Sequence, residues 1–207
     1  DIIKSGGTVV KNVTGYDLSK LVTGSFGTLV ALTEITLKVL PKKKSSNTIT
    51  IHTDDKKLVK NLFEKISSSS SEVSGAIYMP EEPKDESYDQ NKEMVFKFND
   101  LKYKGSFLAL RIEGDKISID EKLKALTIEL ELSKLNTTVL DVHQSTPFWK
   151  KINNLEIFKL TKNNLLRVVV PPSKGPKLMQ FLGNKYKYYI DWCGSLYWIE
   201  VQSKKSS

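Results

Sequence analysis

Cysteine, histidine and arginine are all scarce in this chain, and each scarcity removes a class of chemistry. Of 207 residues, one is cysteine (Cys193) and two are histidines (His52 and His143). A single thiol excludes an intramolecular disulfide and a cysteine-based metal or iron–sulfur site within the chain. The histidines lie far apart and show no zinc-site spacing, so we expect no metal site and structural roles for both.

Lysine carries nearly all of the positive charge. The formal net charge is +8, and only Arg111 and Arg167 are arginines. Apart from short clusters at 42–44 and 204–205, the lysines are dispersed along the chain. Nucleic-acid binding typically uses clustered basic residues with stacking aromatics. The pattern therefore predicts a solvated surface and no nucleic-acid partner.

Long hydrophobic runs are also lacking. No apolar stretch approaches the roughly 20 residues that a membrane helix needs, and no signal-peptide pattern is visible. A composition of 39% hydrophobic and 27% charged residues is that of an ordinary globular protein. We expect a reducing, cytoplasmic setting.

Small residues are concentrated near the start of the chain. Small side chains at positions 24, 25, 27 and 28 allow a backbone to approach a ligand closely. The hydroxyls of Thr14, Ser25 and Thr28 add uncharged hydrogen-bonding groups. This stretch is suited to contact a phosphate- or ring-bearing cofactor.

Local signals predict regular structure around these small residues. Residues 2–3 and 8–10 predict a strand pair with a turn at 5–7. Asp17 is a natural N-cap for a helix over 18–23, which Gly24 would end in a left-handed conformation. Residues 30–40 are rich in β-branched side chains and predict a buried strand that a proline closes.

Two parts of the chain resemble one protein family. The run KNVTGYDLSKL…GSFGTLVALTEITLKVLP, residues 11–41, resembles the second half of the FAD-binding domain of the vanillyl-alcohol oxidase / p-cresol methylhydroxylase (PCMH-type) superfamily. Runs at 147–149, 166–172 and 191–198 resemble the patterns FW, LWRLSVPP and DWGGALRW of the FAD-binding subunit of bacterial glycolate oxidase. Cys193 stands where that pattern has Gly, and Ser195 where it has Ala. Members begin with a longer lobe that binds the FAD pyrophosphate, so the resemblance implies an amino-terminally truncated fragment.

The resemblance implies a cofactor and a set of contacts. The cofactor is FAD, and the glycine turn approaches it through its backbone. The positions carried over are Asn12, Thr14, Gly15, Tyr16, Gly24, Ser25, Gly27 and Thr28, with main-chain contacts to the adenine side from the strand around Val30 to Ile35.

The resemblance also implies an activity and partners. Complexes of this kind oxidise glycolate to glyoxylate and pass electrons from flavin onward. The implied partners are a catalytic flavoprotein subunit and an iron–sulfur subunit, which would also bring the chain to the inner face of a membrane. Two alternatives remain: a self-sufficient FAD-linked 2-hydroxyacid dehydrogenase, which the missing histidine motif disfavours, and a flavin-free scaffold subunit.

The remainder of the chain predicts a second, α+β domain. Residues 42–47 predict a linker between a partial FAD-binding domain (1–41) and a domain over 48–203, with a tail at 204–207. The predicted order is βαβ(β)βαβ, the pattern of a ferredoxin-like sandwich, which is also the kind of fold of the family's cap. The predicted strands are 48–53, 75–80, 94–98, 105–114 and 137–141, with helices after 54–55 and over 119–135.

Aromatic residues and Arg167 mark the carboxyl-terminal part. We expect a helix from Phe148 with Ser145 or Thr146 as its cap, and then the elements 165–170, 176–182 and a hairpin of 186–191 with 195–201. Arg167 could clamp a substrate carboxylate, with an internal or interface ion pair as an equal alternative. Trp149, Trp192 and Trp198 favour core packing over a docking surface. No catalytic base is identified.

Overall fold

The computed structural model describes residues 2–7, 15–81, 96–98, 101–103, 105–158 and 163–201. The chain divides into two compact units, residues 1–42 and residues 43–207. Each unit is described by itself below.

The first unit contains one short helix and extended chain. Helix α1 spans Leu18–Val22, and the Asp17 carboxylate accepts a hydrogen bond from the Lys20 backbone N–H, which caps the helix as predicted. Gly24 has φ of +83°, the left-handed conformation expected after the helix end. No described residue of this unit is buried.

The predicted strand at 30–40 is wrong as a description of this unit. These residues form no strand, and their apolar side chains are exposed, from 43% for Val30 to 85% for Leu40. A strand needs a neighbour to bond its backbone N–H and C=O groups, and none is present among the described residues of unit 1. Residues 2–7 likewise form no strand, and the partner predicted at 8–10 lies outside the described residues.

The second unit is built on a ferredoxin-like core. Strand β1 (Ser45–His52) leads through helix α2 (Lys56–Ser68) to β2 (Val73–Met79), and β5 (Phe107–Gly114) leads through α3 (Lys116–Glu129) to β6 (Thr137–Leu140). Their order in the sheet is β6-β1-β5-β2, with every neighbouring pair antiparallel. This is the arrangement of a split βαβ sandwich, so the predicted α+β fold is confirmed. Strand β1 begins inside the segment 42–47 that the sequence predicted as linker.

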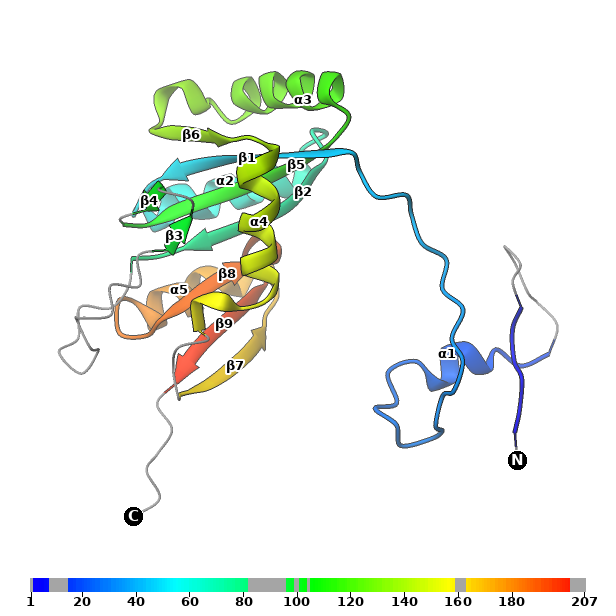
Figure 1. The fold of residues 1–207 in the computed structure, drawn as a ribbon. Helices are drawn as coiled ribbons and strands as arrows, with labels where there is room; N and C mark the ends of the chain where they lie inside the picture. The colour runs from blue at the N-terminus through cyan, green and yellow to red at the C-terminus, as the bar shows by residue number, and fades with distance from the viewer. Residues whose placement is uncertain are drawn as a thin grey trace, which may run out of the picture. The chain divides into compact units, whose positions relative to one another are not determined.

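Three more strands extend this core into a seven-stranded sheet (Figure 1). Strand β8 (Tyr188–Asp191) joins the edge of β2, β9 (Leu196–Val201) follows, and β7 (Asn164–Val169) forms the outer edge. A tight turn at Trp192–Gly194 links β8 to β9, which confirms the predicted hairpin. Of the predicted edge strand 94–98, residues 94–95 lie outside the described residues, and the rest forms β3 (Phe96–Phe98), which pairs with β4 (Leu101–Tyr103) in a separate hairpin.

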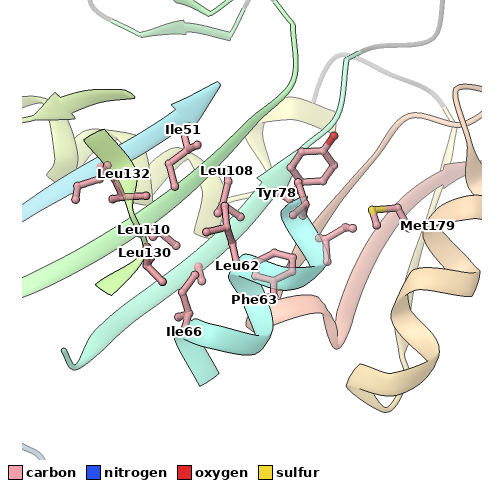
Figure 2. Packing of buried hydrophobic residues seen from close by; sticks show 14 of the residues in the cluster. Ile51, Leu62, Phe63, Ile66, Tyr78, Leu108, Leu110, Leu130, Leu132 and Met179 are labelled. Atoms are coloured by element: carbon pink, nitrogen blue, oxygen red, sulfur yellow. The ribbon is translucent and has the colours of Figure 1, made fainter. Parts of the chain in front are cut away.

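Helices cover the two faces of the sheet and create two apolar cores. Helices α2, α3 and α5 (Gly175–Leu182) pack on one face, where Figure 2 shows the larger cluster around Leu62, Leu108 and Leu110. Helix α4 (Val142–Asn153) lies on the other face and packs Phe148, Trp149 and Ile152 against β2, β5 and β8. The face that carries α4 is called the α4 face below.

Two helix boundaries differ from the sequence-based expectation. Helix α4 begins at Val142 because Asp141 and Gln144 form a reciprocal capping box, so Ser145 and Thr146 are not the cap and Pro147 lies inside the helix. The predicted helix 119–135 ends at Glu129, and the left-handed Glu131 (φ 53°) separates it from the 3₁₀ turn Leu132–Lys134.

Candidate functional site

The predicted cofactor turn of the first unit is a left-handed loop after helix α1. Gly24, Phe26 and Gly27 have φ of +83°, +52° and +76°, and the Thr28 backbone N–H donates to the Ser25 carbonyl at 3.0 Å. The Thr28 hydroxyl donates to the same carbonyl at 2.6 Å. Within the described part of the chain, the amides of Gly24, Phe26 and Gly27 donate no hydrogen bond. Backbone amides without a protein acceptor can donate to an anion.

The turn fits a close backbone approach by a dinucleotide. A Cβ placed at Gly15, Gly24 or Gly27 would meet nothing within 4 Å, so the space that a side chain would fill is open. The other carried-over positions that are described are exposed or half-buried: Tyr16 is 93% exposed and Ile35 64%. Asn12 and Thr14 lie outside the described residues. The structure brings the turn together but shows no enclosed pocket around it in the described residues of this unit.

Arg167 is an exposed residue on the α4 face of the second unit. It lies on the edge strand β7, directly opposite Trp198 of β9. The Arg167 Cζ atom lies 5.2 Å from the ring centroid of Trp192 and 5.9 Å from that of Trp198. Both distances allow cation–π attraction, which favours arginine over tryptophan faces. Within the described residues, the Arg167 side chain makes no hydrogen bond and no ion pair, so no described residue uses its N–H donors.

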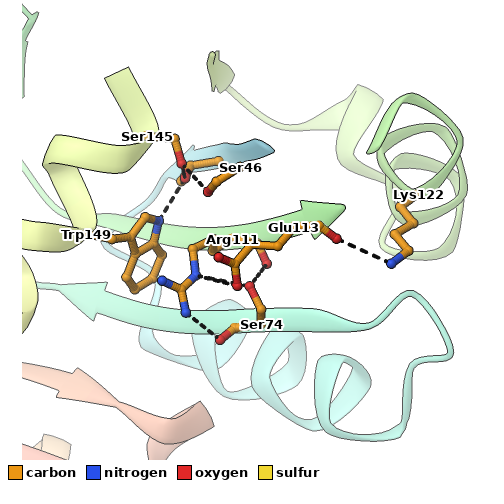
Figure 3. Close-up of polar contacts among 8 residues, drawn as sticks. Ser46, Ser74, Arg111, Glu113, Lys122, Ser145 and Trp149 are labelled. Atoms are coloured by element: carbon orange, nitrogen blue, oxygen red, sulfur yellow. Dashed lines mark hydrogen bonds and ion pairs between the residues drawn. The ribbon is translucent and has the colours of Figure 1, made fainter. Parts of the chain in front are cut away.

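Arg111, on the same face, has the opposite surroundings (Figure 3). Its Cζ atom lies 4.9 Å from the Trp149 ring, but its donors are used: Nε donates to the Ser74 hydroxyl and Nη2 to the Ser74 carbonyl, both at 3.0 Å. Glu113 adds an ion pair at 3.5 Å. Arg111 is therefore a structural residue that ties β5 to β2.

Trp149 belongs to the core, as the sequence analysis favoured. It is 5% exposed, and its indole N–H donates to the Thr48 hydroxyl at 2.8 Å. That hydroxyl also contacts Ser145 at 2.7 Å, and Ser145 contacts Ser46 at 2.9 Å, which joins α4 to β1 through buried polar groups (Figure 3). Buried hydroxyls satisfied in this way fix the packing register of the helix on the sheet.

The turn that carries Trp192 is strained and well anchored. Trp192, Cys193 and Gly194 have φ of 50°, 50° and 95°, and a non-glycine residue in this region costs roughly 1–3 kcal/mol. The Asp191 carboxylate accepts the Trp192 backbone N–H at 2.7 Å, and the Ser195 N–H donates to the Trp192 carbonyl at 3.2 Å. Burial raises the pKa of Asp191, with opposing effects from the Trp192 N–H and from the charge of Arg111.

The remaining reactive side chains have structural surroundings. Burial raises the pKa of the Cys193 thiol, which lowers its thiolate fraction and its reactivity at neutral pH. His143 is exposed at the start of α4, and His52 ends β1. Among the described residues, no group of His, Cys, Asp and Glu is arranged to hold a metal ion.

A shallow pocket of about 180 Å³ lies at the other end of β7, lined by Asn154, Leu155, Phe158, Asn163, Asn164, Leu165 and Glu200. Glu200 is buried there, and its carboxylate accepts a hydrogen bond from the Asn163 amide at 2.7 Å. The sequence analysis did not identify this pocket, because its residues come from three separate segments. It contains none of the predicted site residues.

The sequence analysis also missed the pairing of Arg167 with Trp192 and Trp198. The three residues lie on two strands and a turn, and only the register of β7 on β9 places them together. The aromatic residues and Arg167 of this end were visible in the sequence, but composition alone does not give the contact.

Comparison with known proteins places the chain beside FAD-linked oxidases. It is 57% identical over 44 residues to glycolate oxidase subunit GlcE of Escherichia coli, which is 21% of this chain and 13% of that protein. It is 53% identical over 45 residues to D-lactate dehydrogenase of Anaerostipes hadrus, and 48% over 42 residues to an uncharacterized FAD-linked oxidoreductase of Mycobacterium tuberculosis. These stretches cover 22% and 20% of this chain and 10% and 9% of those proteins. No protein-family model matches the chain.

Solved structures with the same fold extend the resemblance over nearly the whole chain. An alkyldihydroxyacetonephosphate synthase matches 95% of this chain and 44% of its own, with a TM-score of 0.60 and 16% identity. A p-cresol methylhydroxylase with substrate bound matches 81% of this chain and 41% of its own, with a TM-score of 0.52 and 11% identity. The chain thus spans less than half of each of these proteins. The resemblance to glycolate oxidase subunits and the fold of the p-cresol methylhydroxylase type are confirmed.

Proposed function

We propose that this chain is part of an FAD-linked oxidoreductase that acts on the CH–OH group of a small 2-hydroxy acid. The observation that carries the proposal is the 57% identity to a glycolate oxidase subunit over 44 residues of this chain, and a fold match over 95% of the chain at 16% identity is consistent with it. Glycolate, oxidised to glyoxylate, is the substrate that this relative's name supports. D-lactate, from the second relative, belongs to the same 2-hydroxy acid class.

The first unit would contact FAD, and the second unit would bind the substrate carboxylate. The turn from Gly24 to Thr28 would hold FAD through backbone donors, as its open left-handed geometry allows. Asn12, Thr14, Gly15 and Tyr16 are proposed as further contacts, and the segment Val30 to Ile35 as main-chain contacts. Bound flavin supplies a two-electron acceptor for the C–H bond that breaks. Arg167 would bind the substrate carboxylate through its two parallel N–H donors.

The chain would work as a subunit of a complex. Its proposed partners are a catalytic flavoprotein subunit and an iron–sulfur subunit, in the cytoplasm and at the inner face of a membrane through those partners. No helix in the described part of the chain is long and apolar enough to cross a membrane.

Replacement of Gly27 by Ala tests the FAD role. The backbone there has φ of +76° and open surroundings, so the methyl group would meet only a ligand that approaches the turn. We expect FAD binding to weaken about tenfold, or roughly 1.4 kcal/mol, measured as flavin retained by the complex after gel filtration. Gly105→Ala is the matched control, because Gly105 has φ of +88° and equally open surroundings in the second unit.

The same preparations separate the alternatives. Glycolate oxidation by the complex, measured with an artificial electron acceptor, supports the proposal; oxidation by the chain and FAD without partners supports a self-sufficient dehydrogenase. If the complex that contains the wild-type chain assembles without flavin, the flavin-free scaffold role is the one that remains.

A further inference from the structure

Trp192 is an exposed aromatic residue in the turn between β8 and β9, beside the side chain of Arg167. Its indole is 55% exposed, its backbone is left-handed, and its ring lies 5.2 Å from the Arg167 guanidinium carbon. The other two tryptophans are buried or half-buried on the α4 face.

We propose that Trp192 is a positioning residue that holds Arg167 ready to bind a carboxylate. The site consists of Arg167 as the binding group, with Trp192 and Trp198 as the aromatic surfaces that fix its guanidinium. The identity of the carboxylate as that of a 2-hydroxy acid rests on the proposed function, whereas carboxylate binding itself needs no flavin.

Guanidinium geometry makes stacking and carboxylate binding compatible. The five N–H donors of arginine lie in the plane of the group, so an aromatic ring over its face leaves the donors free at its edge. A ring that immobilises this long side chain also removes rotamer freedom before the ligand arrives, which reduces the entropy lost on binding. Arg167 has both conditions: two rings within cation–π distance, and no protein acceptor among the described residues.

The turn 191–194 supplies the rigidity that positioning requires. The Asp191 carboxylate and the Ser195 N–H hold the backbone of Trp192 from both sides. Gly194 is buried, and its carbonyl lies so close to Gly175 that a Cβ there would come within 2.5 Å of it. A Cβ at Gly194 would lie 3.4 Å from the ring of Phe63 in α2, so this ring covers the glycine. The indole therefore projects from a fixed backbone, although its own surface is exposed.

Arg111 provides an internal comparison on the same face of the sheet. It also lies over a tryptophan, but Ser74 and Glu113 occupy its donors. Of the two arginines, Arg167 is the one whose donors no described residue uses, so a carboxylate would bind there.

Calorimetric titration of the chain with sodium glycolate, against sodium chloride at equal ionic strength, tests the proposal. We expect Trp192→Ala to weaken glycolate binding about three- to tenfold, the range that corresponds to one long side chain left mobile. Trp192→Phe, which keeps an aromatic face, should stay within about threefold of wild type. Arg167→Lys should lose most of the affinity, because lysine has neither the planar fork nor the stacking face.

Phe181→Ala is the matched control. Phe181 is 71% exposed on α5, which packs on the other face of the sheet, so its loss should leave affinity unchanged. Equal affinity of Trp192→Ala and wild type would overturn the proposal, as would the absence of glycolate binding by the wild-type chain.

Kinetics of the flavin-loaded complex distinguish this proposal from the proposed function. Trp192→Ala should raise KM about three- to tenfold and leave kcat nearly unchanged, since its effect is on carboxylate binding alone. Glycolate binding that depends on Trp192 in a complex without oxidase activity would reject the proposed function and keep this site. Oxidase activity with an unchanged KM in Trp192→Ala would keep the proposed function and reject the positioning role of Trp192.

Discussion

At the scale of single residues, two stacked tyrosines in the core have opposite hydrogen-bonding states. The rings of Tyr188 and Tyr197 lie 6.4 Å apart, and both side chains are almost fully buried. The Tyr197 hydroxyl donates to the Gly175 carbonyl at 2.7 Å, whereas the Tyr188 hydroxyl has no partner among the described residues. Burial raises the pKa of both phenols, so both stay neutral at physiological pH.

The two tyrosines should therefore respond differently to loss of the hydroxyl. Tyr188→Phe removes an unsatisfied group and should leave the free energy of unfolding unchanged or raise it by up to about 1 kcal/mol. Tyr197→Phe should lower it by about 1–3 kcal/mol, because the Gly175 carbonyl loses its buried donor. Urea denaturation of the two variants measures both effects. An equal loss in both would show that the Tyr188 hydroxyl is satisfied in solution.

Asp191 makes the free energy of unfolding depend on pH, and the sign of that dependence follows from the burial of its carboxyl group. Burial raises its pKa above the ordinary 3.8, so the folded state holds the proton over a range in which the unfolded state has released it. Through that range the free energy of unfolding falls as pH rises, and the penalty is complete once the pH exceeds the raised pKa. Asn keeps an acceptor for the Trp192 N–H and removes the charge.

We therefore expect Asp191→Asn to be more stable than wild type at neutral pH. The difference should shrink as pH falls through the raised pKa and vanish below the unfolded value near 3.8. Thermal unfolding between acid and neutral pH provides the measurement. A variant less stable than wild type at neutral pH would mean that attraction to Arg111 outweighs the burial.

At the scale of elements, the start of α5 and the turn between β8 and β9 pack backbone against backbone. A Cβ at Gly175 would lie 2.5 Å from the Gly194 carbonyl oxygen and 3.0 Å from the Tyr197 hydroxyl. Alanine normally favours a helix over glycine by about 1 kcal/mol, but here the clash involves backbone that cannot move freely. This contact holds the helix and the turn in one arrangement.

Gly175→Ala should therefore destabilise the chain in spite of its better helix propensity. We expect a loss of about 1–3 kcal/mol in the free energy of unfolding, the usual range for overpacking. Gln180→Ala is the control, since Gln180 is exposed on the same helix and should change stability by less than about 0.5 kcal/mol. A Gly175→Ala variant as stable as that control would show that α5 can shift away from the turn.

At the scale of the whole molecule, the two units differ in what stabilises them. The second unit has two apolar cores on the faces of one seven-stranded sheet. The described residues of the first unit include none that is buried, and its apolar side chains from Leu29 to Leu40 are mostly more than half exposed. The predicted FAD contacts lie in the first unit and the predicted carboxylate contact in the second.

Local patterns in the sequence were sufficient for much of this architecture. Asp17 and Gly24 determine both ends of α1 through a side-chain cap and a left-handed residue, and neither needs a distant contact. Alternation and helical spacing gave the order of the ferredoxin-like core, because each element buries one face against the same sheet. The hairpin around Cys193 and Gly194 followed from a turn between two apolar runs.

Tertiary structure decided the rest, where partners come from far along the chain. Residues 30–40 have strand composition but no strand, since pairing and not propensity completes a sheet. The capping box at Asp141 begins the helix before Ser145 and Thr146, where a cap was expected. Ser145 therefore lies inside the helix, and its hydroxyl bonds to Thr48 of β1. The sequence indicated Arg167 as a candidate but did not show its surroundings: cross-strand register gives the donors of Arg111 partners and, among the described residues, leaves those of Arg167 without one beside Trp192.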